Sequence, residues 1–580
     1  MSATTARNGN SATASASASP SASASPAATP GAPTGNVLDV SGLSVSYRTD
    51  AGTTRVVHDV SFSVGQGEVV AVVGESGSGK STTAHAVIGL LPSNGQLDAG
   101  SISLSGVDIA GWNDKRLQSV RGAQIGLVPQ DPSSSLNPVR TIGAQLGEVL
   151  RIHKRGDRRA IDARVLDLLS RVGLSRPELR ARQYPHELSG GMRQRVLIAI
   201  AIALEPQLII ADEPTSALDV TVQRTILDLL DDLRTEFGTS VLFVTHDLAV
   251  ASDRASRIIV MKDGRVVEHG PTTELLANPT VDYTKRLLSD APSLRVEDFL
   301  EPRPPLFLRD ADVAAAESAS AIVVKGLTKD FSTGRRASDV FRAVDDVSFT
   351  VARGTTHALV GESGSGKTTT ARIIARFEKP DAGTISLDGI DVGSIPSKGV
   401  RELRRHVQLV YQNPFGSLDP RQSVGSIIAE PLQNFRIGDR TSRTKRAAEL
   451  VDRVALPASV LGRKPRELSG GQRQRVAIAR ALAIEPRVLI LDEAVSALDV
   501  TVQAQILELL QGLQEELGLT YLFISHDLAV VRQISHTVSV MSAGRVVESG
   551  TTRAVFTNPE DQYTQHLLAA VPGRIGAGGR

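Results

Sequence analysis

Two glycine-rich stretches carry the clearest chemistry, Gly74–Ser81 and Gly361–Thr368, and both fit the pattern G-x-x-x-x-G-K-[ST]. Glycine lets a backbone turn tightly, so several N–H groups can converge on one anion. The lysine of such a loop can reach the β- and γ-phosphates of a nucleotide, and the Ser or Thr hydroxyl can be offered to Mg²⁺. The expected nucleotide-binding residues are Gly74, Glu75, Ser76, Gly77, Ser78, Gly79, Lys80, Ser81 and Thr82, and Gly361, Glu362, Ser363, Gly364, Ser365, Gly366, Lys367, Thr368 and Thr369.

Each of these stretches, called the first and second phosphate loops below, follows an apolar run. Val69–Val73 precedes the first loop and His357–Val360 precedes the second, and both runs read as buried strands. A helix-like segment follows the first loop. A single match could be a chance glycine-rich turn, but a match repeated in this setting predicts two nucleotide-binding sites.

Two acidic pairs, Asp212–Glu213 and Asp492–Glu493, each follow an apolar run that reads as a buried strand. A carboxylate at such a strand end, beside a phosphate loop, can hold Mg²⁺, usually through water. The adjacent glutamate could orient or deprotonate a water molecule. The alternative is a pair of solvated acids at a strand end. Because the pair recurs with both phosphate loops, we favour the catalytic interpretation.

The tetrapeptide Leu-Ser-Gly-Gly also occurs twice, at Leu188–Gly191 and Leu468–Gly471, each at an expected helix start. A hydroxyl, flexible backbone N–H groups and a helix dipole together form a second anion-binding surface. The alternative is an ordinary serine N-cap, but the duplication upstream of both acidic pairs favours binding. The expected residues of these two signature segments are Ser189, Gly190, Gly191, Ser469, Gly470 and Gly471.

The whole chain reads as two similar halves. Ser216–Gln223 returns unchanged at Ser496–Gln503, and both halves end alike, at Asp282–Thr284 and Gln562–Thr564. Strands alternate with helices in each half, which argues for a parallel-rich α/β domain. The expected divisions are a disordered Ser/Ala/Pro tail at 1–36, nucleotide-binding domains at 37–288 and 322–572, a linker at 289–321 and a C-terminal tail at 573–580.

Composition narrows the class of protein. With 64 basic and 63 acidic side chains, the net charge of +1 gives no reason to expect a nucleic-acid partner. The absence of cysteine excludes disulfides and thiolate metal sites. The apolar run Val196–Leu204 is far shorter than the ~20 residues of a spanning helix, and the N-terminal residues lack the pattern of a signal peptide. Any membrane role is therefore expected to be peripheral.

Together these motifs resemble the nucleotide-binding domains of ATP-binding-cassette (ABC) transporters, from Val37 to about Pro572. The resemblance implies an α/β fold of two P-loop NTPase domains in tandem, each with a RecA-like core, an antiparallel β subdomain and a helical subdomain. It also implies ATP hydrolysis, with ATP and Mg²⁺ bound. Tyr47 and Phe331 match the aromatic residue that stacks on adenine in this family.

The resemblance assigns further roles. His246 and His526 occupy the position whose histidine contacts the γ-phosphate, although a histidine after an apolar strand is more often structural. Gln130 and Gln412 match the glutamine on a loop that links Mg²⁺ to the membrane partner. The expected catalytic residues are Glu213, Glu493, His246, His526, Gln130 and Gln412, and the expected metal-site residues are Ser81, Gln130, Asp212, Thr368, Gln412 and Asp492.

In this family two domains sandwich two ATP molecules head to tail. By that resemblance, the loop with Lys80 shares a site with Ser469–Gly471, and the loop with Lys367 shares one with Ser189–Gly191. The active unit is then an intramolecular pseudo-dimer. The halves differ little: Met192 stands where the second half has glutamine. Because no charged catalytic group is lost, both sites are expected to be competent.

The segments after Gln130 and Gln412, and the Asn-Pro…Tyr-Thr stretch near the end of each half, look like the dipeptide, oligopeptide and nickel importer branch. That branch implies two transmembrane permease subunits and an extracellular substrate-binding protein as partners. The expected location is the cytoplasmic face of the cell membrane, reached through those partners. The transported substrate is not named by the sequence.

Two other classes stay open. ATPase subunits of exporters or drug-resistance systems look similar and differ chiefly in their partners. Twin-cassette ATPases of translation or repair also lack spanning segments. Translation-type relatives typically have a long charged arm between cassettes and repair relatives have zinc-binding cysteines, whereas this linker is short and cysteine is absent.

Overall fold

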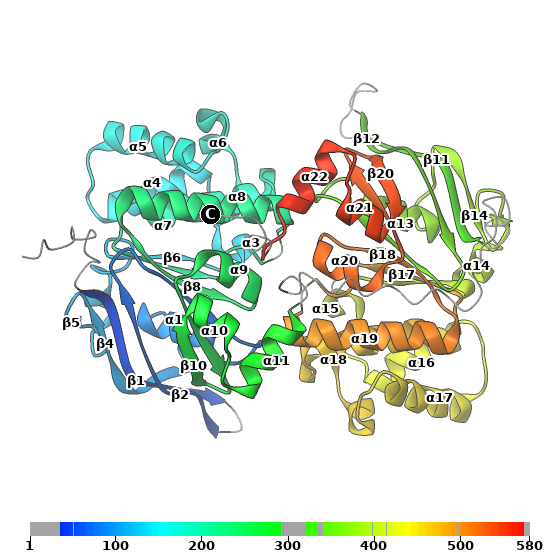
Figure 1. Cartoon of the computed structure of the whole chain (residues 1–580), viewed down its shortest axis with the longest axis horizontal. Coiled ribbons are helices and arrows are strands. Elements are labelled where there is room, and N and C mark those ends of the chain that lie inside the picture. The colour runs from blue at the N-terminus through cyan, green and yellow to red at the C-terminus, as the bar shows by residue number, and fades with distance from the viewer. Residues whose placement is uncertain are drawn as a thin grey trace, which may run out of the picture. The chain divides into compact units, whose positions relative to one another are not determined.

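The computed structural model of the chain describes residues 35–49, 52–216, 218–291, 294, 320–332, 340–396, 398–412, 414–496 and 498–573. The expected tail at 1–36, the linker at 289–321 and the C-terminal tail at 573–580 therefore lie almost wholly outside the described residues. Residues 35–291 are called the first half below, and residues 320–573 the second half. Both halves have the same element order and the same two kinds of sheet (Figure 1).

A mainly parallel sheet forms the centre of the first half. Its strand order is β10-β9-β3-β8-β7-β6, in which only β10 runs antiparallel to its neighbour. The strands are β3 (Val69–Val73), β6 (Ile125–Val128), β7 (Leu208–Asp212), β8 (Ser240–Thr245), β9 (Arg257–Lys262) and β10 (Arg265–Pro271). Parallel strands are covered on both faces, which explains why β3, β7 and β8 are continuous apolar runs.

A second, antiparallel sheet has the order β2-β1-β4-β5. Its strands are β1 (Asn36–Thr49), β2 (Gly52–Gly65), β4 (Gly95–Leu104) and β5 (Val107–Asp108). Strand β1 is a single long strand, and its pairing with β2 contains register shifts. Figure 1 shows this sheet at one end of the first half and helices α4 to α6 at the other.

Helices connect the strands of the first half. The short elements of this half are α2 (Asp114–Leu117), α3 (Pro132–Ser135), α6 (Pro177–Arg182), η1 (Pro185–Glu187), α9 (Leu248–Arg254) and α10 (Thr272–Ala277). The longer helices are α1 (Lys80–Val87), α4 (Ile142–Ile152), α5 (Arg158–Arg171), α7 (Gly190–Ile202), α8 (Val220–Phe237) and α11 (Asp282–Asp290). Side-chain N-caps fix several starts, among them Ser189 on α7 and Asp219 on α8.

Two hydrophobic cores lie on opposite faces of the parallel sheet. Val70 and Val72 of β3 belong to the core that includes β1, β2 and α1. Val69, Ala71 and Val73 belong to the core with α4, α5, α7 and α8. The alternation follows from the two-residue period of a strand. Because β3 packs into both hydrophobic cores, its end and the first phosphate loop that follows are held between them.

The second half repeats this architecture, with sheets in the orders β12-β11-β14-β15 and β16-β17-β18-β13-β19-β20. Its strands are β11 (Ser320–Ser332), β12 (Val340–Ala352), β13 (Thr356–Val360), β14 (Ala382–Leu387), β15 (Ile390–Asp391), β16 (Val407–Val410), β17 (Val488–Asp492), β18 (Thr520–Ile524), β19 (Thr537–Ser542) and β20 (Arg545–Thr551). Because β11 begins at Ser320, ordered structure starts two residues before the expected boundary at 322.

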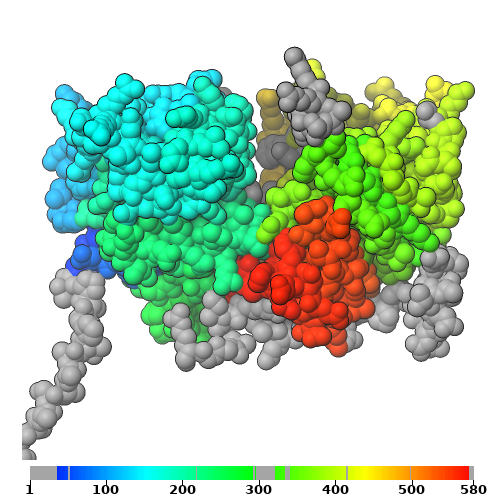
Figure 2. Space-filling model, turned by 90° about the horizontal axis from the view of Figure 1, so that it is seen from above, coloured from blue at the N-terminus to red at the C-terminus, as the bar shows by residue number. Residues whose placement is uncertain are grey.

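The helices of the second half are α13 (Lys367–Ile374), α14 (Val400–His406), α15 (Pro414–Ser417), α16 (Val424–Asn434), α17 (Arg440–Arg453), η2 (Ala458–Gly462), η3 (Pro465–Glu467), α18 (Gly470–Leu482), α19 (Val500–Leu517), α20 (Leu528–Ile534), α21 (Thr552–Thr557) and α22 (Gln562–Ala569). In the space-filling view, the helical residues of the first half, in cyan, form one continuous surface (Figure 2). Within the described residues, no helix is both long and apolar enough to cross a bilayer.

Candidate active site

Each phosphate loop joins a buried strand of the parallel sheet to a helix, β3 to α1 and β13 to α13. Gly74 has a φ of 150°, and a Cβ atom there would come 2.2 Å from the carbonyl oxygen of Met261. Gly361 is equivalent, with 2.1 Å to the carbonyl oxygen of Met541. No side chain fits at either position, so glycine is required for the loop to pass this close to the neighbouring strand.

The two loop lysines are buried, with 5% of Lys80 and 4% of Lys367 exposed. The Lys80 ammonium donates to the carbonyl oxygens of Gly74 and Glu75, at 2.7 and 2.8 Å, and Lys367 makes the same pair of bonds in its own loop. Burial lowers the pKa of both lysines, although nearby carboxylates oppose the shift. Lys367 also lies 3.3 Å from Ser365 Oγ. A buried cation bonded to neutral oxygens beside nearby carboxylates fits a site that receives phosphate.

A hydroxyl and a carboxylate meet at the base of each loop. Ser81 Oγ donates to Asp212 Oδ1 at 2.9 Å, and Thr368 Oγ1 donates to Asp492 Oδ1 at 3.1 Å. Burial raises the pKa of both aspartates. Oxygen donors of this kind suit Mg²⁺, which is usually held by one or two protein ligands together with phosphate and water. The residues therefore fit the ion that the sequence implies.

His85 was not singled out from the sequence, yet its Nε2 lies 3.6 Å from Asp212 Oδ2. Arg372 occupies the matching position of α13, and its charge lowers the pKa of Asp492. The sequence could have indicated both residues, because each is a basic residue on the helix that directly follows a phosphate loop. Both basic groups offset part of the negative charge that the buried aspartates bring to the site.

The glutamates that follow β7 and β17 contact both other side chains predicted for catalysis. Glu213 accepts a 2.6 Å hydrogen bond from Gln130 Nε2, and its other oxygen lies 3.2 Å from His246 Nδ1. In the second half Gln412 Nε2 lies 2.6 Å and His526 Nδ1 lies 3.3 Å from Glu493 Oε2. The structure thus brings the predicted glutamate, glutamine and histidine together in each half.

In each glutamate–histidine pair, either group shifts the pKa of the other toward its charged form. Burial alone would raise the pKa of Glu213, but the bond and charge of His246, together with Lys80, hold that pKa below its usual range. Burial likewise opposes protonation of His246, but Glu213 outweighs it and the pKa of His246 is raised. The same directions hold for Glu493 and His526. An ionised carboxylate in this position can accept a proton from water.

Backbone geometry at these glutamates is unusual. Glu213 has a φ of 46° and Glu493 a φ of 49°, in the left-handed region that side chains rarely adopt. Their backbone N–H groups donate to the carbonyl oxygens of Val244 and Ile524, at 2.8 and 2.9 Å. The turn is therefore fixed by the end of the adjacent strand, and it directs the chain away from the sheet directly after the aspartate.

The signature serines begin helices α7 and α18, as expected. Ser189 Oγ accepts from the Met192 N–H, and Ser469 Oγ accepts from the Gln472 N–H, both at 3.3 Å. Gln472 Oε1 also accepts from the Ser469 N–H at 3.1 Å, which completes a reciprocal cap. Met192 occupies the matching position of the first half and has no side-chain oxygen to accept this bond. The first signature segment therefore has the bond to the Ser189 hydroxyl but lacks the reciprocal bond.

Hydrogen bonds between the halves reach both phosphate loops. The Ser76 N–H donates to Asp499 Oδ2 at 3.3 Å, and the Ser363 N–H donates to Asp219 Oδ2 at 3.5 Å. Asp219 and Asp499 are also the N-caps of α8 and α19. Among the described residues, the hydroxyls of Ser189 and Ser469 cap their own helices rather than bonding to the opposite loop. The sequence did not single out these aspartates, although they lie in the segment Ser216–Gln223, which returns unchanged at Ser496–Gln503.

Comparison with known proteins accounts for these features. Residues 57–216 and 344–496 match the family described as ABC transporter, and residues 547–577 match the C-terminal region described for oligopeptide/dipeptide transporters. The chain belongs to the ABC transporter family. It is accordingly an ATP-binding protein and an ATPase, with two ABC cassettes, one in each half.

Named relatives of this ABC protein extend over most of its length. The oligopeptide transport ATP-binding protein OppD of Mycobacterium tuberculosis is 43% identical, across 92% of this chain and 98% of OppD. The glutathione import ATP-binding protein GsiA of Salmonella typhimurium is 42% identical, across 93% and 90% of the two chains. The peptidoglycan transport ATP-binding protein YejF of Agrobacterium fabrum is 44% identical, across 92% and 96%.

The aromatic residues expected at adenine lie on the antiparallel sheets of the two ABC cassettes. The Tyr47 hydroxyl lies 3.4 Å from Thr82 Oγ1, at the start of α1. The ammonium of Lys329 lies 5.4 Å from the centre of the Phe331 ring. Contact with adenine remains a prediction for both residues.

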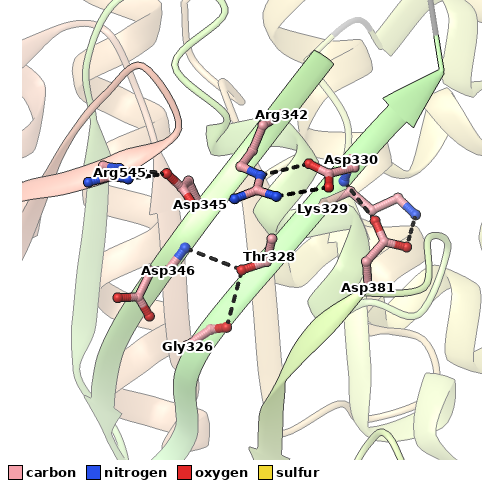
Figure 3. Close-up of polar contacts among 9 residues, drawn as sticks. All are labelled: Gly326, Thr328, Lys329, Asp330, Arg342, Asp345, Asp346, Asp381 and Arg545. Carbon is pink, nitrogen blue, oxygen red and sulfur yellow. Dashed lines mark hydrogen bonds and ion pairs between the residues drawn. The ribbon is translucent and has the colours of Figure 1, made fainter. Parts of the chain in front are cut away.

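A network of charged side chains fixes the end of β11, where Phe331 lies (Figure 3). Arg342 on β12 donates to both carboxylate oxygens of Asp330, at 2.8 and 3.1 Å. The Asp330 N–H donates to Asp381 Oδ2 at 2.7 Å. On the same strand as Arg342, Asp345 pairs with Arg545 at the start of β20. The network therefore connects the antiparallel sheet to the edge of the parallel sheet.

Proposed function

We propose that the chain is the ATP-binding and ATP-hydrolysing subunit of an importer of peptides. The observation that carries the proposal is the match of residues 547–577 to the C-terminal region of oligopeptide/dipeptide transporters. The names of the relatives support the same class, because they specify oligopeptide, glutathione and peptidoglycan transport. Glutathione is itself a tripeptide.

At each ATP site, this chain's own residues have separable tasks. In the first half, Lys80 and the loop N–H groups bind the β- and γ-phosphates, and Ser81 and Asp212 hold Mg²⁺. The ion, when bound, neutralises charge on the phosphates. Glu213 accepts the proton of the attacking water, and its neighbours Gln130 and His246 orient the carboxylate. The equivalent residues of the second half are Lys367, Thr368, Asp492, Glu493, Gln412 and His526.

We assign each ATP site to both halves of the chain. The first phosphate loop is completed by Ser469–Gly471, and the second by Ser189–Gly191. Support comes from the bonds that Asp499 and Asp219 accept from the opposite loops. These aspartates cap α19 and α8, which pack against the signature helices α18 and α7 of their own halves.

The partners follow from the same proposal. Two transmembrane permease subunits contact the chain, an extracellular protein delivers the peptide, and the chain lies at the cytoplasmic face of the cell membrane. The relatives are named as ATP-binding proteins of transport systems, which supports a separate membrane component. In this proposal Gln130 and Gln412 transmit permease contact to the ATP sites, and the bond that each makes to the glutamate of its own half supports that role.

The test begins with purification of the full chain together with its membrane and substrate-binding partners. The assembly is reconstituted in liposomes with ATP, and uptake of radiolabelled di- and oligopeptides is measured. We expect uptake to require ATP and to be lost when both Glu213 and Glu493 are replaced by glutamine. Uptake of nickel without peptide, or outward movement of the cargo, would reject the peptide-importer assignment while leaving the ATPase intact.

A further inference from the structure

The last helix of each half reaches back to the phosphate loop of the same half. Tyr283 on α11 accepts a hydrogen bond from the Glu75 N–H, at 3.1 Å from Oη to N. Tyr563 on α22 accepts one from the Glu362 N–H at 3.0 Å. The partners are 208 and 201 positions apart in the sequence, yet the geometry is the same in both halves.

Neighbouring side chains hold each phenol in place. Tyr283 is 8% exposed, and the Lys262 ammonium lies 4.9 Å from the centre of its ring. In the second half Ser542 occupies the position of Lys262 and hydrogen-bonds to Tyr563. Burial raises the pKa of Tyr283 to about 12, so its hydroxyl stays neutral and can accept the loop N–H. Two different neighbours thus preserve the same contact.

Consecutive N–H groups at the start of the loop are held by different parts of the molecule. The Glu75 N–H is bound by Tyr283 of its own half, and the next N–H, of Ser76, is bound by Asp499 of the other half. The helices that carry these groups, α11 and α19, pack against each other, as do α22 and α8 (Figure 1). The first turn of each loop is therefore held by two groups of the protein itself.

We propose that Tyr283 and Tyr563 are positioning residues for ATP binding, each acting on the phosphate loop of its own half. By accepting the N–H of Glu75 or Glu362, the phenol holds the turn from which the other N–H groups and the lysine of the loop converge on phosphate. Preorganisation of this kind increases affinity, because the ordering cost is met before the ligand arrives. The proposal rests on the ATP sites described above.

The test removes only the hydroxyl. Tyr283→Phe is made in the full chain carrying Lys367→Ala, so that the first loop alone binds tightly, and binding of a fluorescent ATP analogue with Mg²⁺ is titrated. We expect the Kd to rise about three- to tenfold, which is the effect of leaving one partly buried N–H without its acceptor. Tyr563→Phe in the same Lys367→Ala chain makes an identical chemical change beside the disabled loop, and shows whether the effect is local.

Kinetics separate positioning from a general structural role. In the chain with both loops intact, Tyr283→Phe and Tyr563→Phe together should raise the KM for ATP by the same factor, while kcat at saturating ATP changes less than twofold. Tyr521→Phe is the matched control. Tyr521 lies in β18, is fully buried, and its hydroxyl donates to the Leu510 carbonyl at 2.8 Å. The substitution should lower the melting temperature without changing the KM.

Several outcomes would overturn the proposal. An unchanged Kd in the folded Tyr283→Phe chain would do so, as would an equal effect of Tyr563→Phe beside the disabled loop. A fall in kcat with no change in KM would assign the phenols to a different step. If the parent chain with intact tyrosines bound no ATP, the assignment of the ATP sites would be wrong. That result differs from the three outcomes above, which concern the tyrosines alone.

Discussion

The Gln130 side-chain amide donates to the Glu213 carboxylate at 2.6 Å, although 83 positions separate the two residues. The bond engages one of the two oxygens that could take a proton from water, while His246 faces the other. The two contacts orient the Glu213 carboxylate, and because each of its oxygens can accept more than one hydrogen bond, a water molecule can still bind there. We expect the bond from Gln130 to fix the direction in which the carboxylate faces that water.

Replacing Glu213 and Glu493 by glutamine should separate ATP binding from turnover. The glutamine oxygen can still accept from Gln130, so the local geometry is retained, but the proton acceptor is lost. We expect phosphate release to fall by roughly 10²-fold or more, if base catalysis is the main loss. The measurement is steady-state phosphate release beside an ATP titration, and turnover close to wild type would exclude these glutamates as bases.

The two buried lysines should be required for nucleotide binding. Lys80→Ala with Lys367→Ala removes the charge from both loops and leaves the carbonyls of residues 74, 75, 361 and 362 without their donors. Tight binding of ATP with Mg²⁺ should be lost, while circular dichroism shows an intact fold. Unaltered ATP affinity in the folded double variant would contradict the assignment of the phosphate loops.

The glutamate–histidine pairs predict a defined pH dependence of stability. The pKa of Glu213 is lowered from 4.5 on folding, so its contribution is complete above 4.5 and is lost as the pH falls through the folded value. The pKa of His246 is raised from 6.5, so its contribution is complete below 6.5 and is lost as the pH rises through the folded value. The pair therefore stabilises most between pH 4.5 and 6.5.

His246→Asn with His526→Asn tests this expectation. The difference in unfolding midpoint between wild type and variant should be largest within that window and should shrink on both sides of it. Denaturant unfolding at closely spaced pH values, without nucleotide, measures the difference. A difference that does not change with pH would mean that the histidines act by packing alone.

The composite sites make a prediction across the two halves. A bulky residue in place of Ser469 should impair hydrolysis at the site of Lys80, which lies in the other half of the chain. With Lys367→Ala present, hydrolysis by the first loop can be followed alone. Ser469→Phe should then abolish it and Ser189→Phe should leave it largely intact. The opposite result would show that each signature segment serves the loop of its own half.

Local patterns in the sequence predicted most of the fold, and they indicated candidate site residues that the structure brings together in each half. The phosphate loops, acidic pairs and signature segments each depend on neighbours within a few positions, so spacing alone identifies them. Contacts across hundreds of residues were not predicted. Asp499 and Tyr283 join the first phosphate loop from 423 and 208 positions away. Both residues lie in segments that are similar in the two halves. The sequence does not show that they bond to the phosphate loop, because that contact depends on how the chain packs in three dimensions.

The positive φ of Glu213 and Glu493 has a consequence for how such a chain can be stabilised. A residue with a Cβ in this conformation costs the fold about 1–2 kcal/mol relative to one with an ordinary backbone. Glycine would relieve that cost at both turns, but it would also remove the two carboxylates. Glycine would also remove the contacts that each carboxylate makes with its histidine and glutamine neighbours. Relief of backbone strain and loss of these contacts therefore oppose each other at the same two positions, and the proposed base of the reaction would be lost with the strain.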